Sequence, residues 1–487
     1  MTLSSSGFYM LLAILAPLAG ALICVALSAG WAKEALVATA VAQMASVAVL
    51  FARVMQTGDV VVEYAWMKSI GSTMTFRADA LSVTFAVLVS GLCLLDAIYA
   101  RGYMDPDVAK NSFYAWQSLF AGSMVGVLFA GDMILFYLFW ELMLIPSTAL
   151  IVYWGKGKSP LRVGIKYYMV THVGAVFMLL GILWTMVLTG TSDMGAAAEA
   201  LLSVDPAVVL RIGGLFVAGF MVKMAVVPGH IWLPDAHSEA ELPTSVMLSA
   251  IMMNMGIYGI LRFLDGIVPP SSLASLAIPL MALGVVNQWY GGIQALRQVE
   301  LKRIAAYSTI SQMGYVLFGL GTASALGTRG AIMQAFAHGM GKALLFMTIG
   351  VVIHSTGAHR IDEVSGLGRR MPLTMLCAVV AALTLSGAPP FAAFQSEWQI
   401  FAAGMSRAGF ALTLASIAAG IVTALYCLGL VMRVFYGTEK SPEGRAHDAG
   451  AAMMAPMLVL AVASLAVGVF PAVISTWAEA AVTHLLR

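Results

Sequence analysis

Residues 133–154 read MILFYLFWELMLIPSTALIVYW and carry one charge, Glu141. About twenty apolar residues cross a hydrocarbon core of ~30 Å as a helix. A charge near the centre of such a helix is costly, about 2.5–3.5 kcal/mol for Asp, Lys or Arg on insertion scales. The stretch therefore predicts a transmembrane helix in which the carboxylate has a function.

The same pattern recurs at Lys223, Lys342 and Glu397, each of which lies well inside an apolar run. Glu397, for example, is the only charged residue between Arg370 and Arg407. Charged residues within membrane segments generally mark ion pathways or proton relays. A chain that places four of them there is expected to move ions or protons.

The composition indicates an integral membrane protein. The 487 residues are 60% hydrophobic and 10% charged, whereas soluble proteins carry about 25% charged residues. A net charge of +2 favours neither nucleic acid nor an acidic partner. No CxxC pair and no nucleotide-binding motif is present, so we expect no cofactor and no metal bound by this chain. The four cysteines stand singly in apolar runs: Cys24, Cys93, Cys377 and Cys427.

The hydrophobic runs predict an all-α fold of about fourteen transmembrane helices. Prolines interrupt the seventh span after Lys223 and the twelfth before Glu397. Broken helices survive at membrane depth where protein or water satisfies their backbone, as in inverted-repeat transporters. The alternative is that the prolines merely kink packed helices. The predicted spans are 8–30, 35–53, 80–99, 113–130, 133–154, 167–189, 208–227, 244–262, 272–292, 304–321, 331–354, 372–403, 409–432 and 451–476.

Basic residues predict the orientation. With fourteen spans, sixteen of the 26 lysines and arginines fall in odd-numbered loops and seven in even-numbered loops. Cytoplasmic loops carry the excess of Lys and Arg. We therefore expect the odd-numbered loops in the cytoplasm and both termini outside, in the cytoplasmic membrane of a bacterium or archaeon.

Several polar residues are candidates for a proton relay. A buried Glu141 needs a cationic or protonated partner, and Lys223 is the hypothesis; the alternative is a static ion pair. His338 and Lys342 are four residues apart and share a helix face. Asn254 is a candidate to carry water between them and Lys223. His172 is a secondary relay candidate because histidine titrates near neutral pH, the alternative being a hydrogen-bonded structural role.

A cluster of possible ligands lies after the first break but matches no zinc spacing. Its three prolines favour a shaped turn instead. The cluster consists of His230, Asp235, His237, Glu239 and Glu241.

The motifs together resemble the antiporter-like membrane subunits of respiratory complex I and its relatives, over roughly residues 80–435. These motifs are Trp140-Glu141 with Pro146, Val222-Lys223 with Pro228 and the run WLPDAH at 232–237, the run LKRIAAYS at 301–308, His338 with Lys342 and the run ALLF at 343–346, and Pro389-Pro390-Phe391 with Glu397.

The resemblance implies fourteen helices with two inverted five-helix repeats. It divides the chain into an N-terminal three-helix segment (1–112), two repeats (113–262 and 272–432) and a C-terminal loop and helix (433–487). It also implies that Glu141 and Lys223 form the first half-channel pair and that Glu397 serves the exit. The length is similar to the M-type subunit of NADH-quinone oxidoreductase rather than the longer L-type.

Two features depart from the M-type pattern. Asn254 stands where M-type subunits usually have a lysine. Lys342 and the run FQSEW at 394–398 look closer to relatives in F420H2 dehydrogenases, membrane-bound hydrogenases and Mrp-type cation/proton antiporters.

The resemblance implies a proton-translocating, redox-inactive subunit of a complex I-like NADH:quinone oxidoreductase-type pump. Its partners would be other membrane subunits of a multi-subunit respiratory complex, antiporter-like neighbours included, within the lipid bilayer. One alternative is a subunit of a cation/proton antiporter, a membrane-bound hydrogenase or an F420H2 dehydrogenase. Another is a membrane scaffold whose charges serve assembly only.

Overall fold

The computed structural model describes residues 5–67, 73–157, 159–269, 274–441 and 446–485. Three basic residues of the orientation count, Lys68, Lys158 and Arg445, lie outside these ranges, as do positions 272–273 of the ninth predicted span.

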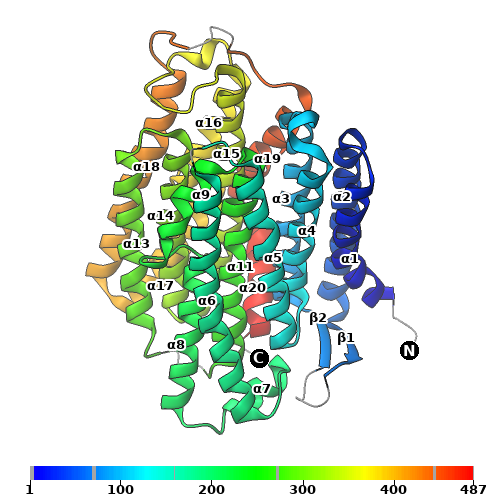
Figure 1. Cartoon of the computed structure of the whole chain (residues 1–487). Helices are drawn as coiled ribbons and strands as arrows, with labels where there is room; N and C mark the ends of the chain where they lie inside the picture. Colours follow the sequence, from blue (N-terminus) through cyan, green and yellow to red (C-terminus); the bar gives the residue numbers. More distant parts are fainter. Residues whose placement is uncertain (1–4, 68–72, 158, 270–273, 442–445, 486–487) are drawn as a thin grey trace.

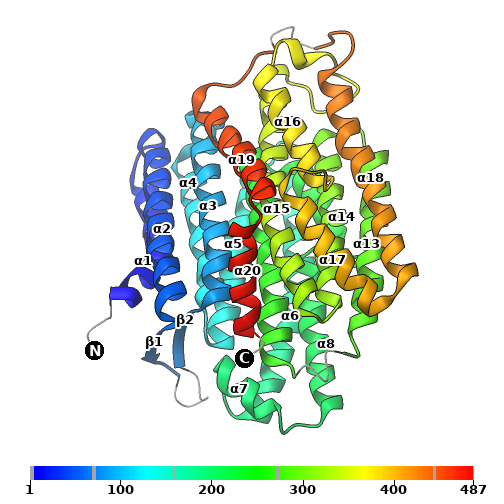
Figure 2. The same ribbon diagram turned by 180° about the vertical axis from the view of Figure 1, so that it is seen from behind.

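Long helices run side by side and form one bundle (Figure 1). Helices α1 and α2 stand at one edge, and α13 and α18 stand at the other. Both termini lie at the same end, which also carries α7 and the β-hairpin (Figures 1 and 2). The long helices are α1 (Ser5–Ala26), α2 (Ala29–Thr57), α3 (Ala80–Tyr103), α4 (Pro106–Phe129), α5 (Met133–Trp154), α6 (Pro160–Thr189), α8 (Pro206–Lys223), α13 (Ala277–Arg297), α14 (Leu301–Gly321), α15 (Ala325–Thr356), α16 (Pro372–Leu385), α17 (Ala392–Ala408), α18 (Phe410–Phe435), α19 (Ala451–Val469) and α20 (Ala472–Leu485).

Shorter elements connect these helices. They are α7 (Met194–Leu201), η2 (Gly229–Trp232), α9 (Leu233–Glu239), η5 (Leu367–Arg369), and the consecutive segments α10 (Leu242–Val246), η3 (Met247–Met252), α11 (Met253–Ile260) and η4 (Leu261–Asp265).

The predicted helical membrane fold is confirmed. Within the described residues, ten helices are long and apolar enough to cross a membrane. Each of the fourteen predicted spans coincides with a helix, with two helices joined by a break or, at 244–262, with the consecutive segments α10, η3, α11 and η4. The number of crossings and the inverted repeats stay predictions.

Two parts of the chain differ from the sequence reading. Residues 54–79, predicted as a loop, contain the antiparallel strands β1 (Val60–Ala65) and β2 (Thr73–Ala78). The valines at the start of β1 explain this, because β-branched residues favour strands. The last predicted span is also broken: α19 ends at Val469 and α20 begins after Pro471. Proline has no N–H and disfavours helix in the preceding residue, so the helix stops there.

Close backbone packing places α14, which carries part of the candidate site, against α13. A Cβ atom on Gly291 would lie 2.4 Å from the Ser311 nitrogen, and one on Gly314 would lie 2.5 Å from the Gly284 oxygen. Small residues at such contacts let membrane helices approach closely. The spacing of these helices therefore depends on glycine at the contact.

A buried ion pair ties the β-hairpin end of the bundle to its C-terminus. Asp79 is fully buried and caps α3 by accepting a 2.9 Å hydrogen bond from the Ser82 nitrogen. Arg262 Nη2 donates to one Asp79 oxygen at 2.8 Å, and Nη1 lies 2.7 Å from the other oxygen in the same ion pair. His484 on α20 approaches the same carboxylate at 3.2 Å. One carboxylate thus joins α3, η4 and α20.

Replacing Arg262 with methionine is expected to destabilise the protein by about 3–5 kcal/mol, because the substitution leaves the Asp79 charge buried without its main partner. Thermal unfolding of the purified complex measures the loss. The double variant with Asp79→Asn is the control, since a neutral amide needs no counter-charge. Equal losses in the single and double variants would contradict the pairing.

Candidate functional site

The first helix break directly follows the lysine predicted in the seventh span. Lys223 is the last residue of α8, and Ala225 has a positive φ of 51°. Side chains satisfy the backbone groups that the break releases. The Trp232 indole donates to the Val222 oxygen at 2.9 Å, and the Val227 nitrogen donates to Asn287 at 2.9 Å. The break is therefore a built feature, in keeping with the prediction of a broken helix.

The second break lies between α16 and α17 and holds Glu397 close to its backbone. The Gln312 amide donates to the Leu385 oxygen at 2.9 Å, where α16 ends. Gly387 in the connection has φ +64°, and a Cβ atom there would lie 2.2 Å from a Glu397 carboxylate oxygen. Glu397 itself is 8% exposed and lines a mostly apolar cavity of about 430 Å³.

Alanine at position 387 is expected to be harmful for two reasons. A positive φ costs a non-glycine residue about 1–3 kcal/mol, and the added methyl would displace the Glu397 carboxylate. We expect lower thermal stability and lower proton translocation in membrane vesicles. Gly429→Ala is the control, because nothing lies within 4 Å of its Cβ position. If Gly387→Ala behaves like this control, the close contact at the break has no role.

Glu141 contacts a histidine rather than the expected lysine. Its carboxylate lies 3.0 Å from Nδ1 of His172 on α6, and both side chains are partly exposed on the outside of this chain. In the described part of the chain, no ion pair with an N–O distance of 4.0 Å or less joins Glu141 to Lys223. The predicted direct pair is therefore not formed in this conformation, because the lysine turns toward other groups.

Lys223 has unusually weak partners for a buried cation. Its side chain is 2% exposed. Nζ lies 5.2 Å from the centre of the Trp140 ring and 4.0 Å from the Met252 sulfur. An aromatic face attracts a cation, but a thioether is a poor acceptor. The neighbouring Glu141 carboxylate acts on this charge through space. A lysine held so loosely is suited to change its partner or its proton.

His338 and Lys342 share one face of α15, as predicted, and both are fully buried. His338 Nε2 lies 3.3 Å from the Ser249 oxygen, and its Nδ1 has no partner. Lys342 donates to the Ala305 oxygen at 3.0 Å and to the Ser308 hydroxyl. Neutral oxygens are thus the hydrogen-bond acceptors of this lysine among the described residues.

Asn254 lies on α11 in the same helical segment as Ser249 and Met252. Its amide nitrogen donates to the Ala250 oxygen at 2.8 Å, while its buried oxygen has no partner. The unpartnered oxygen is available to accept a hydrogen bond, for example from water. The predicted role of Asn254 as a carrier of water stays a prediction.

A chain of amide and hydroxyl groups leads from Lys342 toward Glu397. Gln312 lies one helical turn beyond the Ser308 partner of Lys342. The Gln334 amide on α15 donates to the Gln312 oxygen at 2.9 Å. The Ser396 hydroxyl on α17 then donates to the Gln334 oxygen, and Ser396 directly precedes Glu397. Hydrogen bonds thus join Gln312, Gln334 and Ser396 across α14, α15 and α17, between the partner of Lys342 on α14 and the residue that precedes Glu397.

Sequence reasoning missed the three polar members of this chain, Gln312, Gln334 and Ser396. A signal was present, because Ser308 and Gln312 are polar at a four-residue spacing within a mostly apolar helix. Their meeting with Gln334 and Ser396 depends on how α14, α15 and α17 pack.

A large polar cavity opens at the end opposite the termini, where the 154–160 and 357–371 connections lie. It has a volume of about 700 Å³ and adjoins a second one of about 330 Å³. Lys302 lines both cavities, together with His359. Burial lowers the pKa of His359, and the charge of Lys302 lowers it further. His359 is therefore neutral around pH 7, and the basic residues that line the larger cavity are Lys156, Lys302, Arg303 and Arg360.

His237 is buried between this cavity and the relay. Its ring stacks on Phe346, and neither ring nitrogen has a hydrogen-bond partner. Lys302 and Lys342 are both close enough to act on it electrostatically. The described residues contain no group of three His, Cys, Asp or Glu side chains that would hold a metal. His237 is therefore a further relay candidate that the sequence reading placed in a shaped turn.

Two broken helices with buried charges beside them are typical of ion-translocating membrane proteins such as antiporters. Comparison with known families agrees. A family described as "NADH:quinone oxidoreductase/Mrp antiporter, TM" matches residues 130–423, and one described as "NADH-Ubiquinone oxidoreductase (complex I), chain 5 N-terminus" matches residues 66–114. The chain belongs to the NADH:quinone oxidoreductase/Mrp antiporter membrane family.

Similar proteins include two cyanobacterial relatives. "NAD(P)H-quinone oxidoreductase chain 4 2" of Thermosynechococcus vestitus is 32% identical over 431 residues, which cover 87% of this chain and 80% of the relative. "NAD(P)H-quinone oxidoreductase chain 4 1" of Synechococcus elongatus is 34% identical over 421 residues, which cover 84% of this chain and 77% of the relative. The resemblance noted from the motifs is confirmed.

Solved structures share the fold. A chain of the Mrp complex from Dietzia sp. matches with a TM-score of 0.89 at 22% identity, over 100% of this chain and 98% of that one. A chain of respiratory complex I from Thermus thermophilus matches with a TM-score of 0.88 at 24% identity, over 98% of this chain and 100% of that one. Both are multi-subunit membrane assemblies, and this chain is a multi-pass membrane protein of the same fold.

Proposed function

We propose that this chain is a proton-translocating subunit of a complex I-like NADH:quinone oxidoreductase-type pump and that it carries no electrons itself. The observation that carries the proposal is the hydrogen-bonded row of Gln312, Gln334 and Ser396, which crosses α14, α15 and α17 in the region that also holds Lys342 and Glu397. The relatives named NAD(P)H-quinone oxidoreductase chain 4 support the host complex.

Protons enter through the polar cavity at the end opposite the termini. Lys302 lines this cavity, and the buried His237 lies close enough to both Lys302 and Lys342 to feel their charges. By the excess of basic loops this end faces the cytoplasm, which puts both termini outside. A cavity lined by charged residues at this end supports the uptake of protons from the cytoplasm.

The middle of the path runs from Lys223 to Lys342. Lys223 is held by a ring and a thioether, so its charge is stabilised weakly and responds to a nearby carboxylate. Asn254 and His338 lie on the helices between the two lysines, each with an unpartnered polar atom. Water bound to these atoms completes the relay, since Asn254 cannot itself exchange a proton.

Coupling to the rest of the complex acts through Glu141. Its carboxylate and His172 are exposed on the outer face of α5 and α6. A carboxyl group and a histidine that face lipid are costly, so a neighbouring membrane subunit covers this face. When that neighbour shifts the pair, the field of Glu141 on Lys223 changes, and the lysine releases or takes up its proton.

Replacing Glu141 with glutamine is expected to lower proton translocation and coupled quinone reduction about tenfold, while the complex still assembles. Glutamine keeps the shape of the side chain but cannot hold the negative charge. Proton uptake by inverted vesicles measures the effect, with exposed Glu199→Gln as the control. An unaffected Glu141→Gln variant would remove this residue from the mechanism.

A cation/proton antiporter without electron transfer is the second candidate, favoured by the match to the Mrp complex over the whole chain. Purification of the native assembly in mild detergent, followed by mass spectrometry, separates the two. Flavin and iron–sulfur subunits with a quinone-binding partner are expected. Co-purification of antiporter-like membrane chains alone would replace the redox-driven pump with cation/proton exchange.

A further inference from the structure

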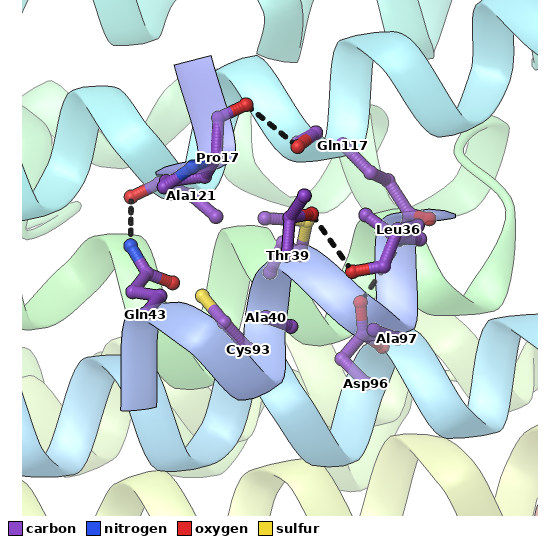
Figure 3. A pocket seen from close by; sticks show the side chains of 12 residues that line it. Pro17, Leu36, Thr39, Ala40, Gln43, Cys93, Asp96, Ala97, Gln117 and Ala121 are labelled. Atoms are coloured by element: carbon purple, nitrogen blue, oxygen red, sulfur yellow. Dashed lines mark hydrogen bonds between the residues drawn. The ribbon is translucent and has the colours of Figure 1, made fainter. Parts of the chain in front are cut away.

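A further ionisable side chain, Asp96, is buried in the membrane part of the N-terminal helices. Figure 3 shows it in the wall of a small cavity among α1, α2, α3 and α4. The cavity has a volume of about 10 Å³, which is room for about one water molecule. Asp96 is the only charged residue between Asp79 and Arg101. The test that singled out Glu141 and Glu397 in the sequence therefore applies to it as well.

The Asp96 carboxyl has too few partners for an ionised group. Its side chain is 1% exposed, and its hydrogen bond comes from the Gln117 amide nitrogen to Oδ2 at 3.1 Å. Oδ1 has no partner. No lysine, arginine or histidine lines the cavity among the described residues. A buried carboxylate is stable only with a counter-charge or several hydrogen bonds, and neither is present.

The groups that face Asp96 are uncharged. Cys93 and Tyr99, on α3 itself, are the titratable groups close to it. From the packed elements α1, α2, α4 and η3, the cavity receives only apolar, hydroxyl and amide side chains. Two of those amides, Gln43 and Gln117, present oxygens without a hydrogen-bond partner. The cavity thus offers unpartnered acceptor oxygens, while the amide and hydroxyl donors in its wall already bond other groups.

We propose that Asp96 binds a proton and forms a second protonation site, separate from the lysine relay. The proton stays on Oδ1, and this O–H group donates a hydrogen bond to one water molecule in the cavity. That water donates its own hydrogens to amide oxygens in the cavity wall. Protonation removes the buried charge and gives the unpartnered oxygens their missing donors. This proposal does not depend on which complex the chain belongs to.

The site adjoins the relay without belonging to it. Tyr99, one turn after Asp96 on α3, donates to the Met347 oxygen of α15 at 2.9 Å. Helix α15 also carries His338 and Lys342. A movement of α15 would therefore reach Asp96 through the contact of α3 with α15. No hydrogen-bonded path between Asp96 and the lysine relay is needed for this.

Infrared difference spectroscopy of the purified complex tests the proposal. A protonated carboxyl gives a carbonyl band that shifts in heavy water, whereas a carboxylate gives none. We expect this band in the wild type at neutral pH and its loss in Asp96→Asn. Absence of any band that depends on Asp96 would overturn the proposal, because the group would then be ionised.

Two further measurements keep the result interpretable. Gln117→Leu removes the hydrogen bond to Oδ2, so the band is expected to move to higher frequency. This variant serves if Asp96→Asn fails to assemble, and an unmoved band would contradict the assignment. Addition of sodium chloride at constant pH is expected to leave the band unchanged. Loss of the band with sodium, but not with choline chloride, would make Asp96 a sodium site and overturn the proton assignment.

Discussion

Replacing Lys342 with methionine is expected to reduce proton translocation about tenfold or more, because the relay then lacks its central proton-binding group. Methionine has a similar length and no charge, so it fits a fully buried position. The hydrogen bonds that Lys342 donates to Ala305 and Ser308 are lost in this variant. Proton uptake by vesicles, normalised to the amount of assembled complex, measures the effect.

Lys440→Met is the matched control for this variant. Lys440 lies in the loop after α18 and donates to the Asp362 oxygen outside the relay. Its replacement is expected to leave proton translocation unchanged. Full translocation by Lys342→Met would show that protons bypass α15, and the proposed path would fall.

Replacing Glu397 with glutamine is expected to have an effect of similar size, about tenfold or more, because Glu397 is the last titratable group of the polar chain. Glutamine retains the hydrogen-bonding capacity next to Ser396 but cannot release a proton. Glu397→Asp restores a carboxylate and is expected to recover part of the activity. The measurement is proton translocation per quinone reduced.

Glu479→Gln is the control, because Glu479 is exposed whereas Glu397 is buried. Glu479 on α20 lies 3.8 Å from Arg329, and its side chain is 65% exposed. The same chemical change there is expected to have no effect. If Glu397→Gln also has none, the exit of the path lies elsewhere. If the Glu397→Asp variant is as inactive as the Glu397→Gln variant, the geometry at the break limits proton translocation, and proton exchange by the carboxyl group does not.

The helical architecture was predictable because each apolar run is long enough to span a bilayer. The breaks after Lys223 and before Glu397 were also predictable, since proline cannot continue a helix. The hairpin at 60–78 and the break at Pro471 were missed. Both depend on local residues that the search for long apolar runs passed over.

The candidate site was predictable in part. Isolated charges identified Glu141, Lys223, Lys342 and Glu397, but not which of them touch. The approach of His172 to Glu141 is set by the rotation of α6 against α5, which one sequence does not specify. Asp96 met the same criterion as the four charges and was overlooked in the sequence.

Proton translocation coupled to electron transfer tests the central claim most directly. The native complex, purified through a tag on this chain and reconstituted in liposomes, reduces quinone while a dye reports protons inside. The proposed function predicts uptake of protons with each quinone reduced and a lower ratio in the Lys342→Met complex at equal electron transfer. An unchanged ratio in that complex would contradict a proton path through this chain.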